Sequence, residues 1–197
     1  MPDASASLWV WRHPRPHDAA GRCIGRSDVG VDHRRVKRLA HRIRQVARRH
    51  GLPRHVLTSP LRRCAAVGRW LRHRDRRNES LPALRETDFG RWDGIAWTQI
   101  AREEVDAWCA DFLCHRPGDG ESLRGLFECV AAWQPVGLPA VIVSHGGWML
   151  TRQWLSSGRS APILAEAWPA PPRYGARRVL PGTLAPVGAG AGPGGAS

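Results

Sequence analysis

Residues Leu8–Pro14, LWVWRHP, form a short apolar run that ends abruptly on an arginine and a histidine. Four β-prone apolar residues bounded by a proline predict a buried strand. In open α/β sheets, ligands bind in the crevice outside the carboxyl ends of the strands. The strand therefore delivers Arg12 and His13 to a position where a functional site is expected. A solvated arginine and a loop histidine at a strand end remain the alternative interpretation.

Outward from this strand, apolar segments alternate with amphipathic ones along the chain. Further strands are predicted at residues 55–58, 81–84 and 140–144, with an edge strand at 174–180. Helices are predicted at residues 33–50, 59–71, 95–112, 121–133 and 148–155. This alternation predicts an α/β fold, a three-layer α/β/α sandwich with a mostly parallel central sheet.

The 197 residues have the length of one domain, which we expect to span residues 8–180. Residues 1–7 and the Gly/Ala/Pro-rich residues 181–197 are expected to be disordered. No apolar run reaches the ~20 residues of a membrane helix or has the form of a signal peptide, which predicts a cytoplasmic protein without a membrane partner. The five cysteines are odd in number and show no repeating spacing, so we expect reduced thiols.

The formal net charge is +13, and Lys37 is the only lysine. Such a surplus of arginine indicates a nucleic-acid partner, an anionic small substrate, or merely a biased composition. One face of the predicted helix at 33–50 carries most of its arginines, but no aromatic residues lie between them. A solvated helix face is therefore favoured, and a nucleic-acid-binding module is kept as the alternative function.

A second strand-to-histidine junction follows residues 140–144, where the chain continues with His145 and two glycines. Glycine lets a backbone approach a ligand closely, so Gly146 is a candidate for substrate binding. The Ser-Pro pair at 59–60 is typical of a helix start and places Arg62 and Arg63 in the first turn. An anion bound there would meet backbone N–H groups and a guanidinium together.

These residue types suit phosphoryl transfer. Arginines bind phosphate oxygens bidentately, and a neutral histidine among them can attack phosphorus. A second histidine would stabilise charge in the transition state. The leaving alkoxide needs a proton, for which Glu86, in the glycine-bounded loop after residues 81–84, is the candidate donor.

Five motifs in this order resemble the histidine phosphatase superfamily, which has the phosphoglycerate-mutase-like fold. They are Arg12-His13, Thr58–Arg63 (TSPLRR), Leu84–Gly94 with its Glu86, Gly120–Ser122 (GES) and Val143–Gly147 (VSHGG). The resemblance implies that His13 becomes phosphorylated, that His145 is the second catalytic histidine and that Glu86 is the acid. It also implies a phosphate site that contains Arg12 and a second arginine, which we assign to Arg62 with Arg63 as the second choice. Pro14 stands where the family signature has glycine.

Within the family, the short chain and the loop at residues 21–28 look most like the α-ribazole phosphatase group of bacterial cobalamin biosynthesis. This resemblance implies a small phosphorylated substrate, such as α-ribazole 5′-phosphate, with another sugar phosphate or a phosphoprotein as alternatives. The loop leaves the strand that carries His13, so we expect Arg22 and Arg26 to add positive charge to the substrate pocket. We expect a metal-independent phosphomonoesterase without a cofactor.

Overall fold

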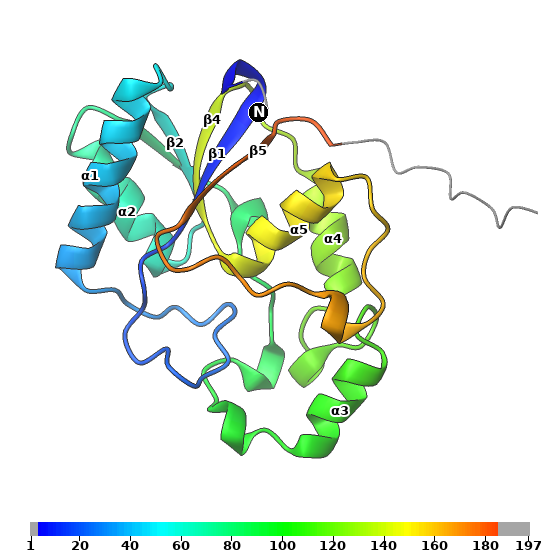
Figure 1. Ribbon diagram of the computed structural model, residues 1–197. Coiled ribbons are helices and arrows are strands. Elements are labelled where there is room, and N and C mark those ends of the chain that lie inside the picture. The colour runs from blue at the N-terminus through cyan, green and yellow to red at the C-terminus, as the bar shows by residue number, and fades with distance from the viewer. Residues whose placement is uncertain (1–3, 185–197) are drawn as a thin grey trace, which may run out of the picture.

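The computed structural model describes residues 4–184 (Figure 1). Within these residues, one sheet has the strand order β3-β2-β4-β1-β5. The strands are β1 (Ser7–Arg12), β2 (His55–Thr58), β3 (Arg77–Ser80), β4 (Ala140–Ser144) and β5 (Arg177–Pro181). The pairs β1–β4, β2–β4 and β2–β3 are parallel, and β5 runs antiparallel to β1. The expected mostly parallel sheet is therefore confirmed.

Helices cover both faces of the sheet. They are α1 (His33–Arg49), α2 (Arg62–Arg72), α3 (Arg102–Ala110), α4 (Leu123–Ala132) and α5 (Gly146–Ser156). Side chains of β1 alternate between two cores: Leu8 packs with residues of α4 and α5, whereas Trp9 packs with residues of α1 and α2. Figure 1 shows these helix pairs on opposite sides of the sheet. The expected three layers are present, and no helix within residues 4–184 has the length and apolar character of a membrane span.

The third strand lies at Arg77–Ser80, so the prediction of a strand at residues 81–84 is wrong. β3 is an edge strand that pairs only with β2, so backbone hydrogen bonds hold a polar sequence there without an apolar face. Leu84 is buried at the end of a 3-10 turn, Pro82–Leu84, whose proline has no N–H for a ladder.

Helix α3 begins at Arg102, seven residues later than the pattern predicts. The backbone before Arg102 pairs with another segment instead of continuing the helix: Cys23 N donates to Ile95 O (2.9 Å), and Ala96 forms a β-bridge with Arg22. These contacts tie the start of the loop at residues 21–28 to the segment that leads into α3.

The ends of the domain extend slightly beyond the predicted limits. Ser7 belongs to β1 and Pro181 to β5, although both were expected outside the domain. Residues 1–3 and 185–197, which belong to the two segments expected to be disordered, lie outside the described residues.

Candidate active site

Two parallel strands bring the two histidines together. Arg12 at the end of β1 lies opposite Ser144 at the end of β4, and each strand is followed by a histidine. His13 N donates to Ser144 O (3.0 Å), and the ring centroids of His13 and His145 are 5.0 Å apart. Only 3% of His13 and none of His145 is exposed. The carboxyl edge of the sheet therefore holds a buried pair of imidazoles.

The guanidinium of Arg63 lies between the two rings. Its Nε–H is 3.2 Å from His13 Nε2 and 3.2 Å from His145 Nδ1. Its terminal amines donate to the backbone carbonyls of Ser27 (2.7 Å) and Gly25. Arg63 is fully buried and forms no ion pair with any residue of the described part of the chain. A buried cation without a counter-charge is costly, so this position favours an anionic ligand.

The arginine beside the histidines is Arg63, so the prediction of Arg62 from the motif is wrong. Arg62 is exposed, and its backbone N–H donates to Asp28 Oδ1 (2.6 Å) at the start of α2. Two signals in the sequence point to Arg63. The arginine two residues beyond Leu61 completes the Ser-Pro-x-x-Arg spacing, and Arg63 precedes the buried Val67 by four residues, on the same helix face.

Both histidines are neutral at pH 7. Burial, followed by the nearby charge of Arg63, holds the pKa of His13 well below its ordinary value. The same two causes, in the same order, hold the pKa of His145 well below its ordinary value. Because the carbonyl of Pro14 can only accept, His13 Nδ1–H donates to it (2.8 Å), and the lone pair of Nε2 faces the site. Pro14 thus orients the candidate nucleophile through its carbonyl oxygen.

Cys64 contacts His145 and was not identified from the sequence. His145 Nδ1 accepts from Arg63, so Nε2 carries the proton and faces the Cys64 sulfur at 3.4 Å. Burial raises the pKa of the Cys64 thiol, which keeps the sulfur uncharged. Arg63 thereby selects the tautomer of the second histidine, and Cys64, the next residue along α2, contacts its other ring nitrogen.

Arg12 and Tyr174 cover the other side of the histidines. Arg12 Nη1 donates to Pro172 O (2.6 Å), and its Cζ lies 4.1 Å from the centroid of the Tyr174 ring. The Tyr174 ring in turn lies 5.4 Å from the ring of His13. The Nε of Arg12 is buried and has no hydrogen-bond partner among the described residues. One polar hydrogen of this guanidinium is therefore free to bind a ligand.

Glu86 lies against the start of α5, next to the predicted ligand-binding glycine. Its carboxylate accepts from the N–H groups of Thr87 (3.2 Å) and Gly147 (3.2 Å). A Cβ at Gly147 would overlap Glu86 Oε1, and one at Gly146 would lie 3.2 Å from Arg12 Cζ. Neither position has space for a side chain, because Glu86 packs directly on Gly147, and Pro171, whose Cβ would lie 2.8 Å away, packs on Gly146 together with Arg12.

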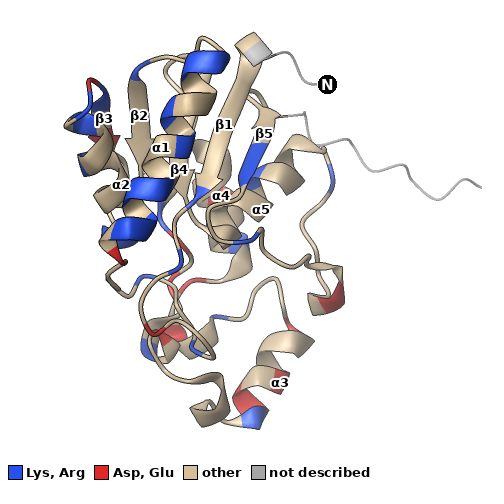
Figure 2. Ribbon diagram, turned by 60° about the vertical axis from the view of Figure 1, so that its left-hand side comes forward, with Lys and Arg blue, Asp and Glu red and all other residues tan. Residues whose placement is uncertain are grey.

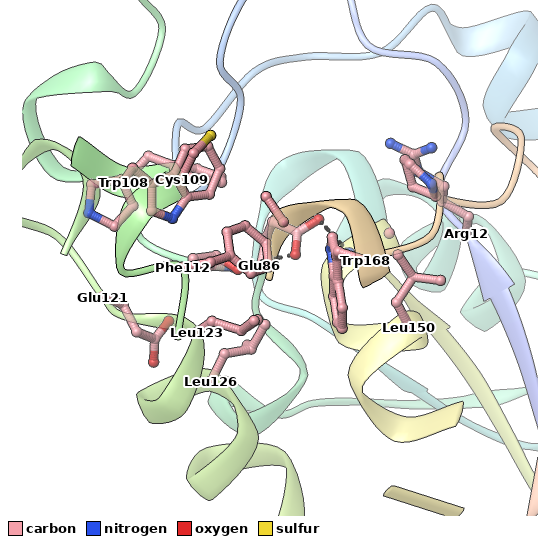
Figure 3. Close-up of a pocket in the computed structure, with 17 residues that line it drawn as sticks. Arg12, Glu86, Trp108, Cys109, Phe112, Glu121, Leu123, Leu126, Leu150 and Trp168 are labelled. Carbon is pink, nitrogen blue, oxygen red and sulfur yellow. Dashed lines mark hydrogen bonds between the residues drawn. The ribbon is translucent and has the colours of Figure 1, made fainter. Parts of the chain in front are cut away.

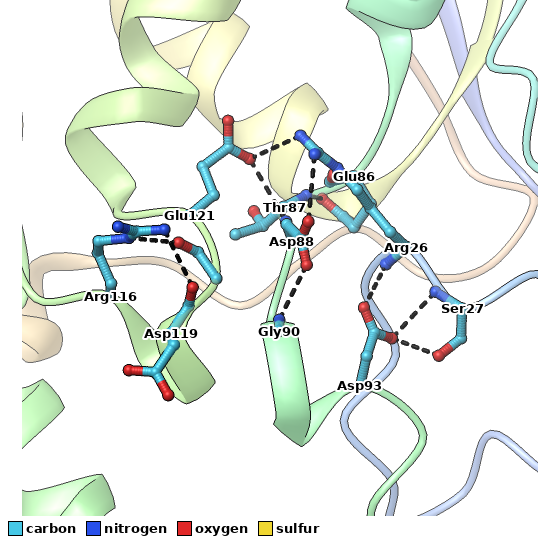
Figure 4. Close-up of polar contacts among 11 residues, drawn as sticks. Arg26, Ser27, Glu86, Thr87, Asp88, Gly90, Asp93, Arg116, Asp119 and Glu121 are labelled. Carbon is cyan, nitrogen blue, oxygen red and sulfur yellow. Dashed lines mark hydrogen bonds and ion pairs between the residues drawn. The ribbon is translucent and has the colours of Figure 1, made fainter.

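The prediction that Arg22 and Arg26 add free positive charge to the pocket does not agree with their contacts. Arg22 is exposed and donates to Gly94 O (2.8 Å). Arg26 is paired with Asp88 (3.3 Å) and Glu121 (3.1 Å), as Figure 4 shows. Arg26 therefore joins three loops, and its carboxylate partners balance its charge.

Two other expectations concern metal ions and nucleic acid. Within residues 4–184, no group of three or more His, Cys, Asp or Glu side chains could hold a metal ion. Figure 2 shows basic residues along the outer side of α1, and Arg34, Arg35 and Arg38 there are exposed. Binding of nucleic acid by this face stays a prediction.

The family model of the histidine phosphatase superfamily (branch 1) matches residues 8–162. The chain belongs to this superfamily, whose members are phosphatases or mutases. No curated protein sequence matches the chain significantly.

Solved structures with the same fold include a protein described as mycobacterial hydrolase 1, with a TM-score of 0.71 and 22% identity over 92% of each chain. A mycobacterial glucosyl-3-phosphoglycerate phosphatase has a TM-score of 0.63 and 22% identity over 81% of this chain and 82% of its own. A phosphoglycerate mutase from Thermus thermophilus has a TM-score of 0.62 and 22% identity over 88% of this chain and 91% of its own. The chain therefore has the phosphoglycerate-mutase-like fold.

Proposed function

We propose that the protein is a phosphomonoester hydrolase that acts through a phosphohistidine on His13. The observation that carries this proposal is the buried guanidinium of Arg63, which lies between two neutral imidazoles and has no counter-charge among the residues that the structure describes. A phosphate dianion bound there would compensate the charge of Arg63. It would also meet the unpartnered Nε–H of Arg12.

In the first step, the lone pair of His13 Nε2 attacks phosphorus, and the bond from phosphorus to the alcohol oxygen breaks. Arg12 and Arg63 stabilise the charge on the non-bridging oxygens, where fixed donors are most effective. The departing oxygen takes a proton from the carboxyl group of Glu86 and leaves as the free alcohol. The products of this step are the alcohol, phosphorylated His13 and the Glu86 carboxylate.

In the second step, a water molecule attacks the phosphorus of phosphorylated His13. The Glu86 carboxylate accepts a proton from this water, and the P–N bond breaks to give inorganic phosphate and neutral His13. His145 takes part by positioning: its Nδ1 accepts from the same Arg63 N–H as His13 Nε2 and so holds the guanidinium beside the phosphate. The pair of steps returns every side chain to its starting protonation state.

The intermediate provides the direct test. A brief incubation with a ³²P-labelled phosphomonoester, followed by quenching in alkali, should leave label on the protein as an acid-labile, alkali-stable adduct at His13. The positive charge in this scheme comes from arginine side chains, so the same labelling and turnover are expected in excess EDTA. Turnover that stops with EDTA, or label found on serine or cysteine, would contradict the proposal.

A Glu86→Gln variant tests the proton donor. We expect kcat for an alkyl phosphate to fall by roughly 10²–10³-fold, because the leaving alkoxide then lacks a positioned acid. The loss should be much smaller for 4-nitrophenyl phosphate, whose leaving group needs little protonation. Steady-state rates for both substrates measure this difference. An equal loss with the two leaving groups would assign Glu86 another role.

Among small anionic esters, we propose α-ribazole 5′-phosphate of cobalamin biosynthesis as the specific substrate. The support for it is the resemblance of the loop at residues 21–28. Other sugar phosphates are the alternative, in line with the activity named for the mycobacterial neighbour. A kcat/KM for α-ribazole 5′-phosphate no higher than for phenyl phosphate would remove the specific assignment and leave the phosphatase assignment in place.

A further inference from the structure

A cavity of about 370 Å³ opens beside Glu86 (Figure 3). Arg12, Glu86 and the two glycines at the start of α5 line one part of it. Most of its remaining wall is apolar and includes Phe89, Trp108, Phe112, Leu126, Leu150 and Trp168. In Figure 3, Glu86 lies between Arg12 on one side and Phe112 and Trp108 on the other. The volume is that of a site for a small organic ligand.

The aromatic side chains of this wall support one another. The ring centroids of Trp108 and Phe112 are 5.5 Å apart, and those of Phe112 and Trp168 are 6.5 Å apart. Trp168 also packs on Trp154 of α5 at 5.8 Å. These contacts hold the apolar wall in position before a ligand arrives.

The described residues that line the cavity provide no free cation for a second negative charge on the substrate. Among the described residues that line it, the charged side chains are Arg12, Glu86 and Glu121. Arg12 belongs to the phosphate site, and the other two are acidic. Arg26, which contacts the lining residue Glu121, is paired with Glu121 and Asp88. A carboxylate on the leaving alcohol would therefore lose water without gaining a positive partner.

We infer that this cavity binds the alcohol portion of the substrate, and that the alcohol carries an uncharged, largely apolar ring system. The inference rests on the proposed function, because the acid that protonates the leaving oxygen lies at the boundary between the phosphate site and the cavity. The part of the alcohol that extends beyond the leaving oxygen therefore enters the apolar part of the cavity. Stacking on Trp108 and Trp168 then provides binding free energy for rings that a small polyol cannot gain.

The first arm of the test compares three substrates with similar alkyl leaving groups. These are 2-naphthylmethyl phosphate, glycerol 1-phosphate and 3-phosphoglycerate. We expect kcat/KM to be at least about 100-fold higher for the naphthylmethyl ester than for the other two. Equal values for the three esters, or a preference for 3-phosphoglycerate, would overturn the inference while leaving hydrolysis itself intact.

Two variants locate the preference in the cavity. Trp168→Ala should raise KM for the naphthylmethyl ester by about tenfold or more and leave kcat/KM for glycerol 1-phosphate nearly unchanged. Trp70→Ala removes a tryptophan of α2 that does not line the cavity, and serves as the control. The exposed Cys109, which lines the cavity, allows a variant with little risk to the fold. Cys109→Arg should raise kcat/KM for 3-phosphoglycerate by several-fold, because it supplies the missing cation.

The second arm does not require turnover. Calorimetry should detect binding of the free alcohol, 2-naphthalenemethanol, to the unaltered protein and to Trp70→Ala, with at least tenfold weaker binding to Trp168→Ala. If no phosphate ester is hydrolysed but the alcohol binds in this pattern, the proposed function fails and the cavity assignment stands. If esters are hydrolysed but the alcohol binds to none of the proteins, the cavity assignment is wrong.

Discussion

A His13→Ala variant is expected to retain the fold and to lose phosphatase activity by at least about 10⁴-fold. Removing the nucleophile of a covalent mechanism leaves only the binding and electrostatic contributions of the remaining site. Initial rates with a simple aryl phosphate, together with circular dichroism and the Tm, measure both expectations.

The control for this variant is His17→Ala. His17 follows four residues later, is exposed and belongs to the surface loop after β1. Its replacement should leave the rate within twofold of the unaltered protein. If His13→Ala keeps more than about a tenth of the activity, His13 is not the nucleophile.

An Arg63→Ala variant should lose activity by about 10³-fold, whereas the neighbouring Arg62→Ala variant should keep it within about twofold. Arg63 Nε is the donor that both histidines share, and removal of one such preorganised donor typically costs about 10²–10³-fold in rate. Arg62 is exposed and lies outside this arrangement. The pair changes the same residue type in the same helical turn, so only the position differs.

Inhibition by inorganic phosphate separates a loss of phosphate binding from a loss of folding. Arg63→Ala should raise the inhibition constant for phosphate strongly, and Arg62→Ala should leave it unchanged. Because Arg63 also holds the carbonyls of Ser27 and Gly25, its loss is expected to lower the Tm as well. A normal phosphate affinity in a folded Arg63→Ala protein would remove this residue from the phosphate site.

The sheet and its catalytic edge follow from the sequence, because burial leaves a clear signal there. Strands β2 and β4 were predicted at their observed limits: β4 is an apolar run that is buried at every position, and β2 has a buried apolar pair, Val56 and Leu57. Strands β1 and β4 are parallel neighbours that end at the same edge, which is why His13 and His145 could be expected to meet. The edge strand β3 carries a polar sequence and gave no such signal.

The details of the candidate site depend on contacts between distant segments, which no local pattern contains. Tyr174 covers Arg12 and His13 from a segment about 160 residues further along the chain. Arg26 looked like a free positive charge until the fold brought Glu121 and Asp88 to it. Arg63 differs from these residues, because the sequence alone identifies it. The Ser-Pro-x-x-Arg spacing ends on Arg63, and Arg63 lies on the same helix face as the buried Val67.

The groups that act on phosphorus and part of the cavity wall come from different regions of the chain, and this division bears on how the protein can evolve. The histidines and Arg63 stand at the ends of strands and at a helix start, where neighbouring backbone groups fix them. Part of the cavity lining, Trp108 and Cys109, comes from α3, and Figure 1 shows α3 set apart from the sheet. Replacements in α3 can therefore alter which alcohol is accepted without shifting the groups that act on phosphorus. One reaction can be retained through descent while its substrates diverge.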